Sequence, residues 1–383
     1  MKVFILAGQS NMEGQGQMNP ANVPGTLSHF IANDQSGMFD HIQHPDGSWA
    51  SRDDVWVRYD HGIMGPENRG ILATNLQVGL GEWEEAIGPE LGFGHVMGPY
   101  LQEQVLIIKT AWGGKSLAVD FRPPSSGGTV GPFYSQMIAD IQTAINNIST
   151  EFPQFTGGQI DIAGFCWFQG WNDGESSAYL NEYEQNLKNL IKDVRTDLNS
   201  PNLPFVIGLT GNGGTQIVQS EGWVRDLQTI LVPAQIHAAQ SPEFSHVSYA
   251  DTRPFWKADS LSPEPSFIHH WYNNAESFLR IGNELGLKMI EILEGISTSN
   301  KPLSKEELIS LYPNPLSESF RIEGPVQTYS IKIRDIHGKL LTSFHNIANR
   351  DYTDISHFPK GQYFIEILNT NNERLGTKKI MLR

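Results

Sequence analysis

Short apolar runs recur along the first part of the chain, and segments of helical periodicity separate them. The runs lie at residues 3–7, 105–112, 160–168, 205–210 and 247–251. The first is apolar throughout and the others are mainly apolar, as strands that are buried on both faces are. The segments 131–149 and 177–198 instead repeat apolar residues every three or four positions, as amphipathic helices do. Strands that alternate with helices predict an α/β fold with a doubly wound parallel sheet.

The pattern changes near residue 296. Residues 297–308 are polar, which indicates a linker. From 309 to 383, short segments alternate apolar and polar residues between turns, and this pattern predicts a small all-β sandwich. We therefore expect two domains, at residues 1–296 and 309–383.

Residues 13–88 show neither periodicity. They are rich in Gly, Asn, Asp and Pro, so we expect a long irregular loop there. Its aromatic residues Trp49, Trp56 and Tyr59 are candidates for the wall of a sugar-binding cleft, although packing beneath the loop is an equal alternative.

Composition narrows the classes of partner. The 383 residues carry a formal net charge of −15, which argues against nucleic acid and anionic membrane surfaces. No apolar stretch reaches the length of a transmembrane helix. The single cysteine, Cys166, lies in an apolar run and is expected to be a small buried hydrophobe. Because no Cys/His cluster has metal-ligand spacing, we expect no metal and no cofactor.

Candidate chemistry follows the ends of the predicted strands. Ser10 comes after the first strand, and Gly113-Gly114 comes after the second. The carboxyl ends of parallel strands meet at one edge of a sheet, where open α/β folds build their sites. A serine there is a candidate nucleophile or a helix cap, and a glycine pair offers backbone N–H groups or a simple turn.

The block Gly8-Gln9-Ser10-Asn11-Met12, together with the apolar strand before it, resembles the nucleophile block of SGNH hydrolases. This form is typical of the sialate O-acetylesterase-like group, which includes carbohydrate esterase family 6, the acetyl xylan esterases. The resemblance implies a three-layer, flavodoxin-like sandwich and a Ser10 nucleophile. It also implies an oxyanion hole that includes the Ser10 N–H and the backbone N–H of Gly114, with Gly113 as the alternative.

A third block follows the strand at 160–168. Gly170-Trp171-Asn172-Asp173 is similar to the family segment in which an Asn side chain donates to the oxyanion. The resemblance therefore assigns Asn172 as a donor, and Gln169 remains an alternative because the sialate-esterase branch more often has Glu where this chain has Trp171. Trp171 and Arg122 are candidate substrate contacts.

A histidine late in the chain completes the pattern. The segment His270-Trp271-Tyr272-Asn273-Asn274-Ala275-Glu276 resembles the family's general-base segment, which selects His270 and leaves His269 as the alternative.

The acid of the triad is missing from its usual place. The family usually has Asp three residues before the histidine, whereas this chain has Phe267. Glu264, Asp259 and Asp251 are candidate acids, and a Ser-His dyad oriented by a backbone carbonyl is the alternative.

The segment 309–383 resembles the C-terminal sorting domain of type IX secretion cargo. The resemblance rests on the residues Tyr-Pro-Asn-Pro at 312–315, Asp-Ile-His-Gly-Lys at 335–339, Pro-Lys-Gly-Gln-Tyr at 359–363 and Lys-Lys-Ile at 378–380. It implies the type IX machinery as a partner and a secreted or cell-surface location. The sequence begins directly with a core strand, so we expect that an export signal peptide has been removed.

These observations together imply a secreted serine esterase that removes O-acetyl groups from an acetylated polysaccharide or oligosaccharide, as acetyl xylan esterases do. The alternatives are a sialate O-acetylesterase, another ester hydrolase, or an inactive carbohydrate-binding relative.

Overall fold

The computed structural model describes residues 1–61, 70–216, 222–295, 310–312, 319–323, 328–335, 339–348, 352–370 and 373–382. The chain divides into two compact units, Met1–Thr298 and Ser299–Arg383. Each unit is described by itself.

The first unit is built on a seven-stranded sheet with the order β4-β3-β6-β1-β7-β8-β9. Neighbouring strands are parallel, except that β4 runs antiparallel to β3 at one edge. The strands of this sheet are β1 (Lys2–Gly8), β3 (Arg52–Asp60), β4 (Ile71–Leu76), β6 (Val105–Ala111), β7 (Asp161–Phe168), β8 (Phe205–Gly208) and β9 (Val247–Ala250). A short antiparallel pair, β2 (Gly16–Gln17) with β5 (Ala86–Ile87), lies outside it.

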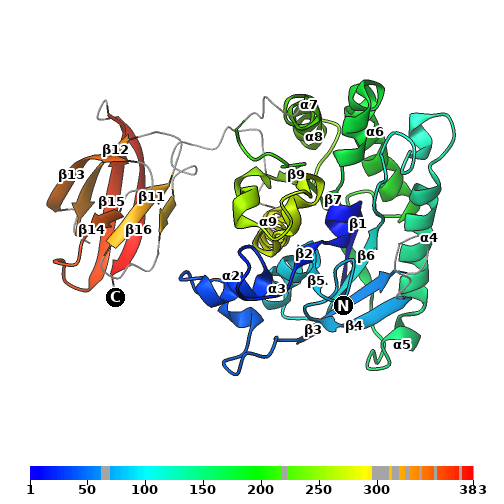
Figure 1. Ribbon diagram of the computed structural model, residues 1–383, viewed down its shortest axis with the longest axis horizontal. Helices are drawn as coiled ribbons and strands as arrows, with labels where there is room; N and C mark the ends of the chain where they lie inside the picture. The colour runs from blue at the N-terminus through cyan, green and yellow to red at the C-terminus, as the bar shows by residue number, and fades with distance from the viewer. Residues whose placement is uncertain are drawn as a thin grey trace. The chain divides into compact units, whose positions relative to one another are not determined.

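Helices cover both faces of the sheet (Figure 1). The α-helices are α1 (Ser10–Glu13), α2 (Leu27–Asn33), α3 (Pro89–Leu101), α4 (Pro132–Asn146), α5 (Ile148–Glu151), α6 (Ser177–Asp197), α7 (Gly222–Asp226), α8 (Val232–Ala239) and α9 (Ala275–Leu293). Short helical turns are η1 (Asp40–Ile42), η2 (Pro124–Ser126), η3 (Trp171–Glu175), η4 (Leu227–Leu231), η5 (Arg253–Phe255), η6 (Asp259–Leu261) and η7 (Ile268–Asn273). Helices α3 and α9 lie on one face, and α4, α6 and α8 lie on the other.

The central strand β1 contributes to two separate cores. Val3 and Ile5 belong to the core beneath α4, α6 and α8, whereas Phe4 and Leu6 belong to the core beneath α3 and α9. Side chains of a strand alternate between its faces, so a strand that is covered on both sides must be apolar throughout. This is why the first run of the sequence has no polar residue.

The register of β1 aligns the ends of three strands. Gly8 pairs with Ala111 of β6 on one side and with Phe168 of β7 on the other. A Cβ atom at Gly8 would lie 2.1 Å from the carbonyl oxygen of Phe168, so only glycine fits there. The segments that follow β1, β6 and β7 therefore leave the sheet side by side.

The fold class predicted from the sequence is confirmed, but the prediction of an irregular segment at residues 13–88 is wrong. This segment supplies β3 and β4 to the main sheet. The charged residues of β3 concealed the strand, because Arg58 is fully buried and its guanidinium pairs with Glu151 at 3.2 Å. Buried charges that are paired in this way interrupt the apolar pattern on which strand prediction depends.

Two of the aromatic residues proposed for a sugar-binding cleft lie in the core instead. Trp56 stacks on Phe152 at 4.9 Å between ring centroids, and Tyr59 is fully buried beside Glu13. Trp49 is partly buried against the core beneath α3 and α9. Packing beneath the loop is therefore what these aromatic residues do.

The second unit contains two antiparallel sheets around one apolar core. The three-stranded sheet has β10 (Ser310–Tyr312), β11 (Ser319–Glu323) and β14 (Tyr352–Asp354), and the four-stranded sheet has β12 (Thr328–Arg334), β13 (Leu340–Ala348), β15 (Gly361–Leu368) and β16 (Arg374–Leu382). Residues of β12 alternate between buried and partly exposed, as the sequence pattern predicts. The predicted linker 297–308, and residues 313–315 and 336–338 of two sorting motifs, lie outside the described residues.

Two further findings concern partners and the cysteine. None of the helices in the described ranges combines the length and the apolar character that crossing a lipid bilayer requires. The thiol of Cys166 is fully buried in β7, as predicted, and burial raises its pKa above the usual value.

The separate cores predict that the first unit folds alone. A chain that ends at residue 298 should keep the thermal transition of the first unit, because the described residues of its two cores all lie within Met1–Thr298. Differential scanning calorimetry would measure this, with Ile365→Ala in the full chain as the matched control that unfolds only the small β-sandwich. A truncated chain that melts more than a few degrees below the full chain would contradict the prediction.

Candidate active site

Ser10 stands directly after the central strand of the sheet. It is the first residue of α1, so its backbone N–H has no partner within that helix. Its side chain is 5% exposed, and its Oγ lies 3.0 Å from Nε2 of His270. The two residues are separated by 260 positions in the sequence, yet they are within hydrogen-bond distance.

Asparagine side chains hold the segment before His270. The amide of Asn11, next to Ser10, donates to the carbonyl oxygen of His269 at 3.0 Å. The amide of Asn212, in the turn after β8, donates to the carbonyl oxygen of Ile268 at 2.8 Å. The histidine segment is thus tied both to the serine segment and to the neighbouring strand.

The segment after His270 has an uncommon backbone. Trp271, Tyr272 and Asn273 all have φ near +55°, a region that residues other than glycine rarely adopt. Such conformations persist only where the surrounding structure imposes them. Trp271 is fully buried and packs against Trp256 at 5.3 Å, which fixes this turn from the inside.

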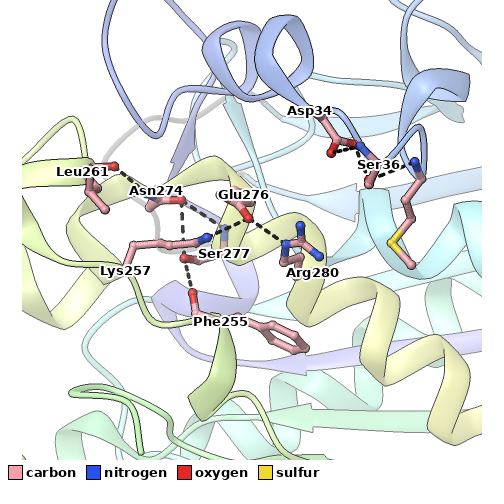
Figure 2. Close-up of polar contacts among 10 residues, drawn as sticks. Asp34, Ser36, Phe255, Lys257, Leu261, Asn274, Glu276, Ser277 and Arg280 are labelled. Carbon is pink, nitrogen blue, oxygen red and sulfur yellow. Dashed lines mark hydrogen bonds and ion pairs between the residues drawn. The ribbon is translucent and has the colours of Figure 1, made fainter. Parts of the chain in front are cut away.

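Helix α9 anchors the end of the same turn, as Figure 2 shows. The side chain of Asn274 caps α9 by accepting from the N–H of Ser277 at 3.2 Å, and it donates to the carbonyl oxygen of Leu261 at 3.0 Å. In the first turn of α9, the carboxylate of Glu276 pairs with Lys257 at 2.7 Å and with Arg280 at 2.8 Å. The position of His270 is therefore set from both sides.

None of the candidate acids reaches His270. Its Nδ1 is buried and has no hydrogen-bond partner among the described residues. Asp251 is engaged by Arg253 at 2.6 Å, and Asp259 accepts from the N–H of Ser260 at 2.6 Å. Glu264 and a backbone carbonyl oxygen are equally missing from Nδ1 in the described part of the chain. The prediction of a triad acid among these three residues therefore has no hydrogen bond to support it in the described part of the chain.

This environment determines the charge of the imidazole. Burial, with a smaller effect from His269, lowers the pKa of His270 to about 3. No carboxylate opposes the effect of burial, so the ring is neutral at physiological pH. Its Nε2 is then free to accept a proton from Ser10.

Gln15 is a further polar group on the histidine ring. Its side-chain Nε2 lies 3.2 Å from Nε2 of His270, and the side chain is 4% exposed. Gln15 and Ser10 therefore share one ring nitrogen. No motif in the sequence pointed to Gln15, although it stands only five residues after Ser10 in the same glycine-rich block.

The side chain of Asn172 is oriented by Gln9. The side-chain NH₂ group of Gln9 donates to Oδ1 of Asn172 at 2.7 Å. The side-chain oxygen of Gln9, Oε1, accepts from the N–H of Gly170 at 3.1 Å. Because Oδ1 of Asn172 faces Gln9, the NH₂ group of Asn172 is directed away from it. This NH₂ group donates to the side chain of Glu175 at 3.4 Å, which is a long hydrogen bond at an exposed position.

Gln169, the alternative donor, is used elsewhere. Both N–H groups of its amide are engaged, with the carbonyl oxygen of Lys115 at 3.0 Å and with Asp173 at 2.7 Å. Asp173 in turn accepts from the backbone N–H groups of Leu117 and Ala118 at 2.8 and 2.9 Å. Gln169 and Asp173 thus join the segment after β7 to the segment after β6, and this arrangement argues against Gln169 as an oxyanion donor.

The glycine pair after β6 lies against the serine segment. A Cβ atom at Gly113 would stand 3.1 Å from Oε2 of Glu13 and 3.5 Å from Cβ of Ser10. Gly114 has φ of +69° and open space where a Cβ would stand. Both glycines are exposed, and Gly114 is the one whose open surroundings leave room for a substrate oxygen.

Glu13 forms a buried polar cluster behind these glycines. Burial raises the pKa of its carboxyl group to about 8, and the charge of Glu82 adds to this, while Lys109, Tyr59 and the Gly113 N–H oppose it. Tyr59 donates to Oε1 of Glu13 at 3.2 Å. Lys109 pairs with the fully buried Glu90 at 2.9 Å. Glu13 is therefore mainly protonated at neutral pH.

The two candidate substrate contacts differ in their surroundings. Four of the five N–H groups of Arg122 donate within the protein, including one to Glu182 at 3.1 Å. Arg122 therefore holds its own loop, and its proposed contact with substrate is not favoured. Trp171 is half-buried beside Asn172 and stacks on Trp223 at 5.2 Å between ring centroids.

The first unit matches a known family. Residues 1–248 match the family model described as carbohydrate esterase, sialic acid-specific acetylesterase, which covers the segments of Ser10, Gly114 and Asn172 and ends before His270. A protein from Arabidopsis thaliana described as a probable carbohydrate esterase is 28% identical over 231 residues, which are 56% of this chain and 71% of that protein.

Solved structures and a second family model complete the comparison. The structure of the Arabidopsis thaliana protein has a TM-score of 0.46 at 17% identity and covers 76% of this chain and 98% of that one. A carbohydrate acetylesterase from Xanthomonas citri has a TM-score of 0.48 at 13% identity and covers 98% of this chain and 80% of that one. Residues 310–383 match the secretion system C-terminal sorting domain. Since the first family model spans more than half of the sequence, the chain belongs to the carbohydrate esterase family of sialic acid-specific acetylesterases, and it ends in a secretion-system sorting domain.

Proposed function

We propose that the protein is a serine O-acetylesterase that acts on acetylated carbohydrate by the SGNH mechanism, in the manner of acetyl xylan esterases. The observation that carries the proposal is the 3.0 Å distance between Oγ of Ser10 and Nε2 of His270. A serine hydroxyl is a weak nucleophile until a base within hydrogen-bond distance accepts its proton. The family supports carbohydrate esters as the class of substrate.

The first half of the reaction forms an acetyl-enzyme. The neutral ring of His270 takes the proton of Ser10 while Oγ attacks the acetyl carbonyl carbon. The carbonyl oxygen gains negative charge, and the N–H groups of Ser10 and Gly114 and the amide of Asn172 stabilise it. When the oxyanion collapses, the bond between the acetyl carbon and the sugar oxygen breaks, and the imidazolium gives its proton to that oxygen, so the sugar leaves as an alcohol.

The second half repeats the same steps with water. His270 takes a proton from a water molecule, whose oxygen attacks the acetyl carbon. Collapse of the second oxyanion breaks the bond between the acetyl carbon and Oγ of Ser10, and the proton on His270 returns to Oγ. The product leaves as acetic acid, which ionises to acetate in water.

Nδ1 of His270 has no hydrogen-bond partner among the described residues, and this makes the imidazolium of the mechanism less stable. Without a carboxylate, the imidazolium that forms in each half has no ion pair on its far side. The base is consequently weak, and the neighbouring Gln15 amide is the polar group that remains to orient it. We therefore treat the pair as a Ser-His dyad with Gln15 as a positioning residue.

The C-terminal unit supports an extracellular role. Its match to a secretion-system sorting domain favours export by type IX machinery and a secreted or cell-surface location. An insoluble or high-molecular-weight glycan is a substrate that such a location makes accessible.

Sialic acid O-acetyl esters are the second candidate, because the matching family is described as sialic acid-specific. Acetate release from acetylated xylan and from O-acetylated sialic acid, measured side by side, decides between them. An inactive carbohydrate-binding relative is the third, and covalent labelling of Ser10 by a fluorophosphonate would exclude it.

The dyad predicts the ranking of three variants. Ser10→Ala and His270→Ala should each lower kcat/KM on 4-nitrophenyl acetate by about 10³-fold or more, because nucleophile and base act as one unit. The matched control, His269→Ala, should cost less than about tenfold, since the ring within hydrogen-bond distance of the Ser10 hydroxyl is that of His270. If His269→Ala were the more damaging histidine variant, the base would have to be reassigned.

The pH profile tests the role of Gln15. Activity requires a neutral His270, so the acid limb of kcat/KM reports its pKa and should lie well below pH 6.5. Gln15→Glu places a carboxylate beside the ring, which favours the imidazolium and should move that limb to higher pH by about one unit or more. Gln15→Ala adds no charge and should leave the limb in place. An unmoved limb in Gln15→Glu would count against contact between the two side chains.

Glu13 predicts a pH dependence of stability. Its pKa is about 8 in the folded protein against 4.5 in the unfolded chain, so the native state binds more protons between these values. The free energy of unfolding should therefore fall as pH rises from about 4.5 to 8, by a few kcal/mol at most. Glu13→Gln should remove this part, so its Tm relative to the wild type should rise with pH. The exposed Glu84→Gln is the control, and a Tm difference that is constant with pH would refute the assignment.

A further inference from the structure

Four aromatic side chains form a continuous strip beside the catalytic pair. Phe267 lies 5.6 Å from His269, His269 lies 5.9 Å from Trp171, and Trp171 stacks on Trp223 at 5.2 Å, all between ring centroids. Phe267 is 40% exposed and Trp223 is 36% exposed. Large apolar side chains that gather at the surface mark a contact site more often than single ones do.

The strip is built from separate segments and is held in place. Trp223 comes from α7 and packs on η3 where Gly174 lacks a side chain, because a Cβ there would stand 2.4 Å from Nε1 of Trp223. The carbonyl oxygen of His269 is held by Asn11, one residue from Ser10. The rings therefore have fixed positions relative to the nucleophile.

One end of the strip touches the base itself. The rings of His269 and His270 are 4.0 Å apart, and Phe267 meets His270 edge-on at 6.3 Å. A ligand whose acetyl group lies at Ser10 would extend along these rings. Phe267, which stands where the family usually has the acid, contributes an exposed ring instead of a carboxylate.

The charges around the strip favour a neutral ligand. Burial lowers the pKa of His269, so its ring carries no charge at neutral pH. The whole chain has a net charge of −15, which repels anionic ligands at long range.

A sugar chain is the neutral ligand that this surface fits. Pyranose rings present a face of C–H groups, which packs on aromatic rings through apolar contact and weak C–H interactions while the hydroxyl groups stay in water. A protein partner would need a contact area of about 1,000 Å² or more, well beyond four side chains. The contact of the strip with His270 also assigns it to the substrate of this site.

We propose that Phe267, His269, Trp171 and Trp223 bind the sugar rings next to the acetylated one, so that the substrate is a neutral glycan chain and not a single acetylated sugar. This inference rests on the proposed function and adds the substrate class to it. Deacetylation should then be more efficient on an oligosaccharide than on a monosaccharide, because the flanking rings gain contacts that a single sugar lacks.

The test compares chains with small esters. Wild-type kcat/KM is measured on acetylated xylo-, manno- and cello-oligosaccharides of about four sugars, on xylose tetraacetate, on 4-nitrophenyl acetate and on 4-nitrophenyl octanoate. Trp223→Ala should lower the ratio of the best chain to 4-nitrophenyl acetate about tenfold, and Trp171→Ala should do so at least as strongly. The matched control is Trp49→Ala, which removes a half-buried tryptophan that packs against the core beneath α3 and α9. This variant should leave the ratio unchanged.

The outcomes separate this inference from the proposed function. A wild type that prefers xylose tetraacetate to all three chains, or a Trp223→Ala variant with an unchanged ratio, would overturn it. A larger loss on 4-nitrophenyl octanoate than on the chains would also do so, because the strip would then bind acyl groups. If no ester were hydrolysed, the proposed function would fail. Calorimetric binding of the deacetylated oligosaccharides to Ser10→Ala, lost in the double variant with Trp223→Ala, would still support the strip, and its absence would refute it.

Discussion

The parallel pairing of β1 with β6 on one side and β7 on the other is the constraint on which the rest depends. It aligns the ends of three strands at Gly8, Ala111 and Phe168, so the three following segments leave the sheet at one edge. Segments separated by more than a hundred residues become neighbours without any long-range signal in the sequence. The serine, the glycine pair and the Asn172 segment lie together because of this register, and α9 brings the histidine to them.

The elements that could be predicted from the sequence are those whose buried side chains are mainly apolar. β1 and β6 each contain a run of four or five apolar residues, and the chemistry at their ends follows from their position. β3 was missed because Arg58 is buried in an ion pair, which a pattern of hydrophobicity cannot reveal. The absence of an acid at Phe267 was visible in the sequence, but the bare Nδ1 of His270 was not. That property depends on the path of a turn whose residues have positive φ.

The candidate site is organised by amides where charged groups would be expected. Gln9 orients Asn172, Asn11 and Asn212 hold the carbonyl oxygens beside the histidine, and Gln15 reaches the ring itself. Neutral donors lose less on burial than carboxylates and do not titrate. The carboxyl group of Glu13, close behind the serine, has a raised pKa and is itself mainly neutral. An uncharged site of this kind suits an uncharged ester and a base that must remain unprotonated.

The lone thiol of Cys166 makes the centre of the sheet observable. It lies in β7, paired with Leu6 of β1 and Val206 of β8, and has no exposed surface. A thiol reagent can reach it only when these strands separate. The rate of labelling under native conditions therefore reports how often β7 separates from β1 and β8. Since the sequence has no second cysteine, this rate needs no mutagenesis and contains no signal from the sorting domain.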